Sequence, residues 1–253
     1  MDNASAVDAL YKSAPPWLRS RTILLARAGS HSYGTSTPAS DLDLRGVAIA
    51  PRDYYMGFSK SFERFTFDSP ETEGEVEELR TFMRKATEGI PQALQLLFCE
   101  QDDVLIASPA GMLLRAYRKA FLSQRLVKPF AGHAKGVLYR ANRPDADPTR
   151  LAKEAMHGVR IARMLHEILT TGEVNVRRAD AADLLAIRRG EVLLETAHAE
   201  IAARLAEVDA LIARTPLPRV PDLDKLDVFC MSIAADFSDV TALSVRLPAS
   251  KSC

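Results

Sequence analysis

AGSHSYG at residues 28–34, followed by SDLDLRG at residues 40–46, decides the fold of this 253-residue chain. The run TILLA at residues 22–26 precedes the first motif and is typical of a short buried strand, which Gly29 interrupts. Glycine has no Cβ, so the backbone at Gly29 can approach a phosphate closely, and Ser30 adds a hydroxyl and an amide donor. These residues predict a strand, a phosphate-sized loop and then a short helix.

Asp41 and Asp43 are two residues apart, so on an extended strand their side chains project from one face while Leu42 and Leu44 point to the other. Two carboxylates this close repel each other and raise one pKa unless a cation lies between them. Magnesium, or manganese in its place, takes a few carboxylates together with substrate phosphate oxygens. A solvated strand edge is the alternative, but the combination of loop and carboxylates predicts a site for a nucleoside triphosphate and a metal.

At this spacing the two motifs resemble the signature of the DNA polymerase beta nucleotidyltransferase superfamily. That signature is a glycine-serine pair, a short helix and an Asp-x-Asp on the next strand. The Ser-Tyr-Gly and Ser-Asp-x-Asp-x-Arg-Gly runs are more specifically similar to predicted bacterial and phage nucleotidyltransferases, some of them linked to RNA repair. One departure is Gly89-Ile90-Pro91, where relatives commonly have Gly-Asn-Pro. Further blocks similar to that family extend over nearly the whole chain, namely 78–82, 89–98, 121–123, 132–136, 153–160 and 171–178.

The resemblance implies an α+β protein with an N-terminal polymerase-beta-like nucleotidyltransferase domain, a mixed sheet with helices, followed by a C-terminal helical bundle. Because the character of the chain changes near Pro91, we expect the catalytic domain at residues 1–98 and the helical domain at 99–253. The implied reaction transfers a nucleoside monophosphate from a triphosphate such as ATP to an acceptor hydroxyl and releases pyrophosphate.

Superfamily enzymes need a third carboxylate on a neighbouring strand, and the acidic run at residues 71–78 is the suitable place. Period-two alternation puts Glu73, Glu75 and Glu77 on one face. The spacing between the acidic position and the following helix in the family that the chain resembles favours Glu73 as metal ligand and general base, with Glu75 next. A solvated acidic loop without any ligand is the alternative reading.

From Pro91 onward the apolar residues recur every three to four positions, which is typical of helices. Lys153, His157 and Arg160 fall on one face of one of them, where the lysine and the arginine can hold triphosphate or the acceptor backbone and the histidine can hydrogen-bond the base or sugar. The alternative is a polar seam between helices. Arg45 stays on the face of the two aspartates and can orient them or reach phosphate. The helical segments are expected at 92–98, 109–121, 123–140, 148–171 and 181–215.

The composition indicates a compact protein with a core, because 47% of residues are hydrophobic and the formal net charge is zero. Neutrality argues against a general polyanion binder, yet a local basic face still permits RNA. The three cysteines lack metal-ligand or disulfide spacing, and no apolar run is long enough to span a membrane, so we expect a cytoplasmic protein. RNA, as a tRNA or an RNA 3′ end, is the favoured acceptor. An antitoxin-like transferase that moves AMP onto protein, and a catalytically silent nucleotide- or RNA-binding module, are the alternatives.

Overall fold

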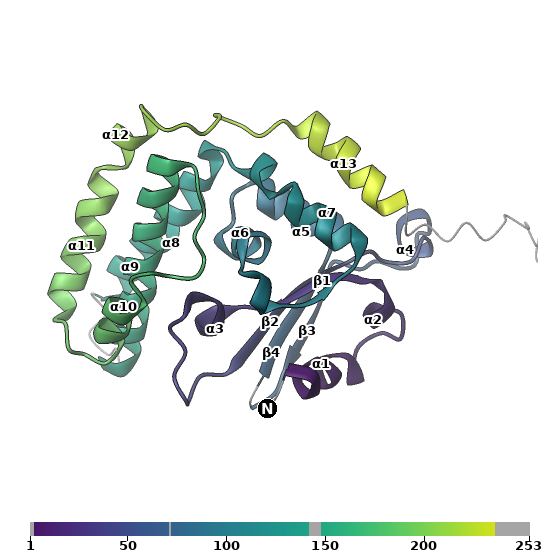
Figure 1. Ribbon diagram of the computed structural model, residues 1–253, viewed down its shortest axis with the longest axis horizontal. Coiled ribbons are helices and arrows are strands. Elements are labelled where there is room, and N and C mark those ends of the chain that lie inside the picture. The colour runs from purple at the N-terminus through teal and green to yellow at the C-terminus, as the bar shows by residue number, and fades with distance from the viewer. Residues whose placement is uncertain (1–2, 71, 142–147, 236–253) are drawn as a thin grey trace, which may run out of the picture.

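The computed structural model describes residues 3–70, 72–141 and 148–235, with only the backbone of Pro148 and Thr149. A mixed sheet carries helices on both faces, and a layer of longer helices stands beside it (Figure 1). The mixed sheet and the helices that follow it confirm the predicted α+β class. Within the described ranges no helix combines the length and apolar character needed to cross a bilayer.

The sheet has five strands in the order β3-β4-β2-β1-β5. β2 and β4 run parallel, whereas the other neighbouring pairs are antiparallel. The predicted strand at residues 22–26 is therefore confirmed as β1, next to the strand that carries Asp43. The bounds are β1 Thr22–Arg27, β2 Leu42–Ala48, β3 Arg64–Asp68, β4 Thr72–Glu78 and β5 Val104–Ala107.

Leu42 and Leu44 are buried on one face of the sheet, as the alternation predicts. This face packs against α1 (Asn3–Lys12) and α2 (Leu18–Arg21), whose apolar side chains share its core. The burial of the two leucines fixes the register of β2, so Asp43 must face the other way.

The opposite face of the sheet is apolar where α5 (Leu79–Thr87), α6 (Pro91–Phe98) and α7 (Pro109–Ala116) cover it. Toward the N-terminal end of β2 it turns polar at Asp43 and Arg45. The short α3 (Gly29–Tyr33) packs against β2 there. The sheet thus keeps one uncovered polar corner, and this corner becomes the candidate site.

Beside that corner stands the helical layer, in which α9 contacts each of four other helices (Figure 1). The helix predicted at residues 148–171 has these bounds in the structure. The single segment predicted at 181–215 is wrong as one helix, because Gly190 adopts a left-handed φ of 75° and ends α10. The layer comprises α8 Val127–Ala141, α9 Pro148–Thr171, α10 Ala181–Arg188, α11 Leu194–Ala206 and α12 Val208–Ile212.

The remaining elements connect these layers, and α13 lies along α5. β5 lies after residue 98, so the sheet takes one strand from the segment assigned above to the helical domain. One hydrophobic core also runs from Leu24 in β1 to Val159 in α9. The division at residue 98 stays a prediction. The connecting elements are α4 Asp53–Met56, the 3₁₀ turns Gln101–Asp103, Arg118–Phe121 and Gln124–Leu126, and α13 Leu223–Ala235.

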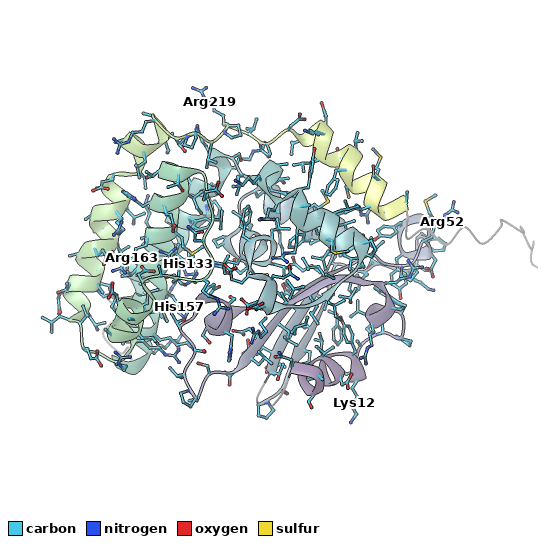
Figure 2. The ribbon with its side chains drawn as sticks, in the orientation of Figure 1. Lys12, Arg52, His133, His157, Arg163 and Arg219 are labelled. Carbon is cyan, nitrogen blue, oxygen red and sulfur yellow. The ribbon has the colours of Figure 1, made fainter. Side chains whose placement is uncertain are left out.

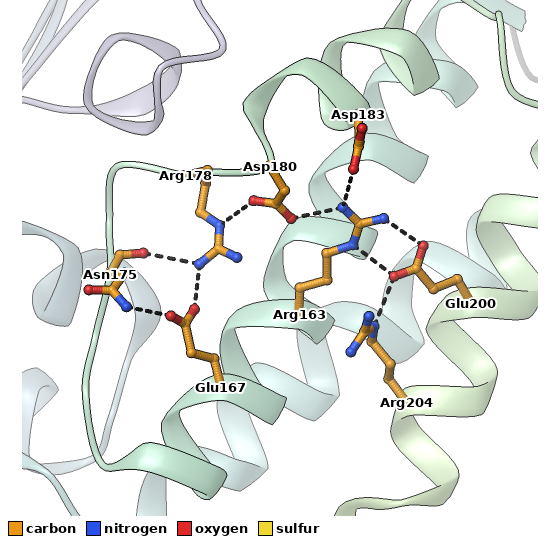
Figure 3. A network of polar contacts seen from close by, with 8 residues as sticks. All are labelled: Arg163, Glu167, Asn175, Arg178, Asp180, Asp183, Glu200 and Arg204. Atoms are coloured by element: carbon orange, nitrogen blue, oxygen red, sulfur yellow. Dashed lines mark hydrogen bonds and ion pairs between the residues drawn. The ribbon is translucent and has the colours of Figure 1, made fainter.

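A network of ion pairs ties α9 to the elements packed around it (Figure 3). The guanidinium of Arg163 donates from Nε and Nη2 to both carboxylate oxygens of Glu200 on α11, at 2.7 and 2.8 Å. Its Nη1 donates to Asp180 at 2.8 Å, and Arg178 joins Asp180 to Glu167. These contacts fix α9, and with it the helix face that carries Arg160.

We expect Arg163→Met to lower the free energy of unfolding by about 1–3 kcal/mol, because two partly buried carboxylates each lose one of their two arginine partners. The hydrogen bonds from Arg163 hold the pKa of Glu200 below its usual range. A lowered folded pKa means that the stabilisation is present at neutral pH and is lost as the pH falls through that pKa. Urea unfolding at pH 7 and pH 3.5 checks both expectations. Arg189→Met, which removes an exposed pair with Glu191, is the control and should leave the free energy of unfolding nearly unchanged.

Candidate functional site

The site begins at the junction of β1 and α3, which lies against the start of β2. The amide of Ala28 donates to the carbonyl of Asp43 at 2.8 Å, which holds the two segments together. Gly29 has a φ of 58°, and a Cβ added there would lie 1.6 Å from Oδ2 of Asp43. The carboxylate of Asp43 therefore rests against the glycine, which explains why this position needs a residue without a side chain. Gly34, at φ 77°, ends α3.

Asp43 is half-buried, and its surroundings set its charge. Burial raises the pKa of Asp43, Arg45 opposes the rise, and the nearby negative charge of Asp41 adds to it. The positive charges of His31 and Lys153 act in the same direction as Arg45. Asp41 itself lies one residue before β2 and is exposed. The two carboxylates are thus close enough to repel each other, which is the arrangement that a cation relieves.

The three glutamates of β4 share the face of Asp43, in agreement with the predicted alternation. Glu73 is exposed and is the ladder partner of Asp43 in the parallel pairing. Glu75 forms an ion pair with Arg45, with Oε1 and Nη1 2.9 Å apart, and Glu77 forms an ion pair with Lys85. Of the three, Glu73 is the one beside Asp43, and it has no ion pair among the described residues; its choice over Glu75 as third carboxylate stays a prediction.

In the part of the chain that the structure describes, no group of three or more His, Cys, Asp and Glu side chains is placed to hold a metal ion. Magnesium does not require such a group, since it takes one or two carboxylates and completes its shell with water and phosphate oxygens. Asp41 and Asp43 supply carboxylates of that kind, and the raised pKa of Asp43 fits a site that gains from a cation. The donor set therefore fits the metal that the sequence predicts.

A cavity of about 540 Å³ opens beside Asp43, between the sheet corner and the helical layer. Of the predicted nucleotide-binding residues, Gly29, Arg45, His157 and Arg160 line it. Ser30 does not line the cavity, whereas Ser32, the second serine of the short α3, does. Lys153 is exposed near the rim, where its charge still reaches Asp43.

Arg160 is the most unusual side chain of this cavity, because it is 4% exposed and has no carboxylate partner among the described residues. Its guanidinium carbon lies 3.7 Å from the centre of the Tyr33 ring, and Nη1 contacts Sδ of Met164 at 3.5 Å. Its Nε has no hydrogen-bond partner in the structure. A buried cation without a counterion is costly, so this position points to an anion as its missing partner.

Two histidines flank Arg160 on α8 and α9, and Figure 2 labels both on the side of these helices that faces the sheet. Burial and the charge of Arg160 lower the pKa of His133. Burial, Arg160 and Lys153 lower the pKa of His157 to about 3. Both rings are therefore neutral at pH 7, and they can donate or accept hydrogen bonds without adding a charge.

The low pKa of His157 makes stability depend on pH. In the unfolded chain this histidine binds a proton near pH 6.5, but in the folded protein it does so only near pH 3. The unfolded state therefore binds more protons between these values, and stability falls on acidification by about 1.4 kcal/mol per pH unit below pH 6.5. We expect His157→Gln to lose less stability than the wild type between pH 7 and pH 5. Urea unfolding at the two pH values measures the difference, and equal losses would contradict the assignment.

The contacts that hold this cavity in shape have no motif in the sequence. Tyr33 is buried, and its hydroxyl donates to Oε1 of Gln95 on α6. Asp103, which is fully buried, pairs with Arg27 at the end of β1 and with Arg177 of the helical part. These partners are more than 60 residues apart in the sequence, so no motif spacing joins them.

Comparison with known proteins assigns the chain to a family. The family model described as RlaP, the RNA repair pathway DNA polymerase beta family, matches residues 6–232. An uncharacterized 38.9 kDa protein of Enterobacteria phage T4 is 32% identical over 85 residues, which are 30% of this chain and 25% of the phage protein. The matched part thus spans a quarter of that relative's length.

Among solved structures, a nucleotidyltransferase-like protein from Exiguobacterium sibiricum aligns over 83% of this chain and 74% of that chain, at 14% identity and a TM-score of 0.31. A TM-score this low carries no argument about the fold. The family match, by contrast, covers both motifs, the sheet and all the helices that line the cavity. The chain belongs to the RNA repair pathway DNA polymerase beta family.

Proposed function

We propose that this protein transfers a nucleoside monophosphate from a nucleoside triphosphate to the 3′-hydroxyl of an RNA. The observation that carries the proposal is the buried, unpaired Arg160 in a cavity that also contains Asp43. The cavity offers a triphosphate what it needs, namely a guanidinium, neutral imidazoles as hydrogen-bond donors and a glycine-lined wall. Arg45, Lys153 and His157 complete the binding set around Arg160.

In the proposed step the acceptor oxygen attacks the α-phosphorus and forms a new P–O bond. The bond from the α-phosphorus to the oxygen that bridges to the β-phosphate breaks, and pyrophosphate leaves with that electron pair. Glu73, or Glu75 in its place, takes the proton of the acceptor hydroxyl. Arg160 and Lys153 hold the phosphates that leave, so their charge stabilises the product as it forms.

Asp41 and Asp43 are the residues that would hold Mg²⁺ or Mn²⁺, and Glu73, the predicted third ligand, is not grouped with them for metal binding among the described residues. The bound ion would supply Lewis-acid neutralisation of the charge that develops on the phosphate oxygens. Asp43 is also held in place by the protein itself, through the Ala28 amide and the close approach of Gly29. We infer that this positioning keeps its carboxylate pointed at the substrate.

The test incubates purified protein with each α-³²P-labelled nucleoside triphosphate, magnesium or manganese, and total RNA or lysate. We expect labelled RNA from the wild type. The rate for Asp43→Asn should be lower by a factor of about 1,000 or more, because the variant loses a metal ligand at the reacting phosphate. Asp224→Asn, an exposed carboxylate on the distant α13, is the matched control and should keep the wild-type rate.

The fraction that carries the label decides the acceptor. Label in protein would replace RNA by the antitoxin-like transferase, and the loss of transfer in Asp43→Asn would then still support the catalytic site. Absence of label in every fraction, from protein that is folded by circular dichroism, would leave the silent binding module.

A further inference from the structure

A second hollow, of about 220 Å³, lies between the sheet and the helices α5 and α6. Its lining combines the apolar side chains of Phe82, Ile90, Ala93 and Leu96 with the polar or charged side chains of Arg45, Glu75, Glu77, Lys85 and Gln92. It is smaller than the usual site for a whole cofactor or drug-sized ligand, and it suits one flat ring with hydrogen-bonding groups at its rim. The motifs of the sequence analysis give this hollow no role.

The hollow adjoins the triphosphate cavity through three shared residues, Arg45, Gln92 and Leu96. The wall between the two spaces contains the pair of Arg45 and Glu75, whose Nη1 and Oε1 are 2.9 Å apart. Glu75 and Arg45 also border a third, open hollow over β2, β3 and β4 that contains Asp43 and Glu73. Asp43 therefore lines the cavity that contains Arg160, and the small hollow adjoins this cavity at Arg45.

The direction of the reaction assigns the two sides. In-line displacement requires the attacking oxygen and the leaving pyrophosphate to lie on opposite sides of the α-phosphorus. Pyrophosphate belongs on the side of Arg160, because that side has the unpaired guanidinium and Lys153. The acceptor must then approach across Arg45, past Glu73 and Glu75, from the side of the small hollow.

We propose that the small hollow binds the 3′-terminal nucleobase of the RNA acceptor and so positions its ribose hydroxyl at Asp43. This inference rests on the proposed function. The side chains of Phe82, Leu96 and Ile90 would contact the faces of the base, as apolar side chains do in sites for unstacked RNA ends. Lys85 uses one of its donors on Glu77, and Gln92 offers both an acceptor and two donors, so the base edge finds hydrogen-bond partners.

The experiment uses two RNA oligonucleotides that differ only at the last residue, which is a normal nucleotide in one and an abasic ribose in the other. Both present the same 3′-hydroxyl. With the wild-type protein we expect kcat/KM for the abasic RNA to be at least about 10-fold lower, the size of one base contact. The KM for the nucleoside triphosphate should not differ between the two RNAs, because that ligand binds on the other side of Asp43.

Two variants locate the effect. Ile90→Phe places a larger side chain in the hollow, so the ratio of kcat/KM for the two RNAs should fall toward one. Lys85→Gln changes only the polar edge at a partly exposed residue, and it provides the test if Ile90→Phe does not fold. Matched unfolding curves show which variant is native.

Equal kcat/KM values for the two RNAs with the wild type would overturn the base site while leaving RNA transfer intact. A ratio that stays at the wild-type value in both folded variants would also overturn it, because the base would then bind elsewhere. Failure of the proposed function has another signature, namely no labelled RNA from either oligonucleotide, and the base site would fall with it.

Discussion

Arg160→Met is expected to raise the KM for the nucleoside triphosphate by at least about 100-fold, the effect of removing a buried charge-assisted contact. The same substitution should leave the ligand-free protein more stable, by about 1–3 kcal/mol, because a buried charge without a counterion is replaced by an apolar chain of similar length. A residue that serves a ligand rather than the fold should show this combination, in which its removal weakens ligand binding and stabilises the ligand-free protein.

The stability gain has two opposing contributions. The guanidinium of Arg160 makes a cation–π contact with the Tyr33 ring, and its replacement by Met loses this contact, which is worth about 0.5–2 kcal/mol. It also removes the cost of desolvating a guanidinium whose Nε has no partner. Removing Arg160 should in addition raise the pKa of His157 and His133 toward 6.5, since its charge contributes to lowering both. Histidine NMR titration measures this shift directly.

Thermal unfolding with inorganic tripolyphosphate separates binding from catalysis. A ligand that binds only the folded state raises the melting temperature. We expect tripolyphosphate to stabilise the wild type and to have little effect on Arg160→Met. The control is Arg204→Met, which removes a cation of the α11 network, away from the cavity lining. A destabilised Arg160→Met with unchanged KM would mean that Arg160 serves the fold alone.

The local elements of this fold could be predicted because each is determined by neighbouring residues. The helix at 148–171 follows from its apolar period and from Gly172, and the burial of Leu42 and Leu44 follows from strict alternation. Gly34 ends α3 through its left-handed backbone, for which glycine is the ordinary choice. In these places the sequence pattern and the tertiary packing require the same residue types.

The contacts that shape the cavity could not be predicted in this way. Tyr33, Gln95 and Arg160 come from three elements, and nothing in their local sequence shows that they meet. The same holds for Asp103, whose burial between two arginines joins the sheet to the helical part. The third carboxylate is a different case. Alternation places the glutamates of β4 on one face equally well, so pattern alone cannot rank them and their ion pairs must be known.

Gly29→Ala is expected to lower the rate of transfer by at least about 100-fold, because the position of Asp43 depends on the missing Cβ. A Cβ at residue 29 would overlap Oδ2 of Asp43 at 1.6 Å, and the carboxyl carbon lies only 2.7 Å away. The backbone of Gly29 is fixed by the turn into α3, so the carboxylate is the group that must move. Moving it takes the carboxylate away from the reacting phosphate.

Strain at a positive φ complicates this substitution, since alanine in the left-handed region costs about 1–2 kcal/mol anywhere. Gly190→Ala separates the two effects. Gly190 has a φ of 75°, and a Cβ there would meet nothing within 4 Å. We expect both variants to lose similar stability in urea, but only Gly29→Ala to lose transfer. If the two kept equal rates, the contact between Gly29 and Asp43 would be a packing feature of the strand, and the position of the carboxylate would have to be set by Ala28 and the substrate instead.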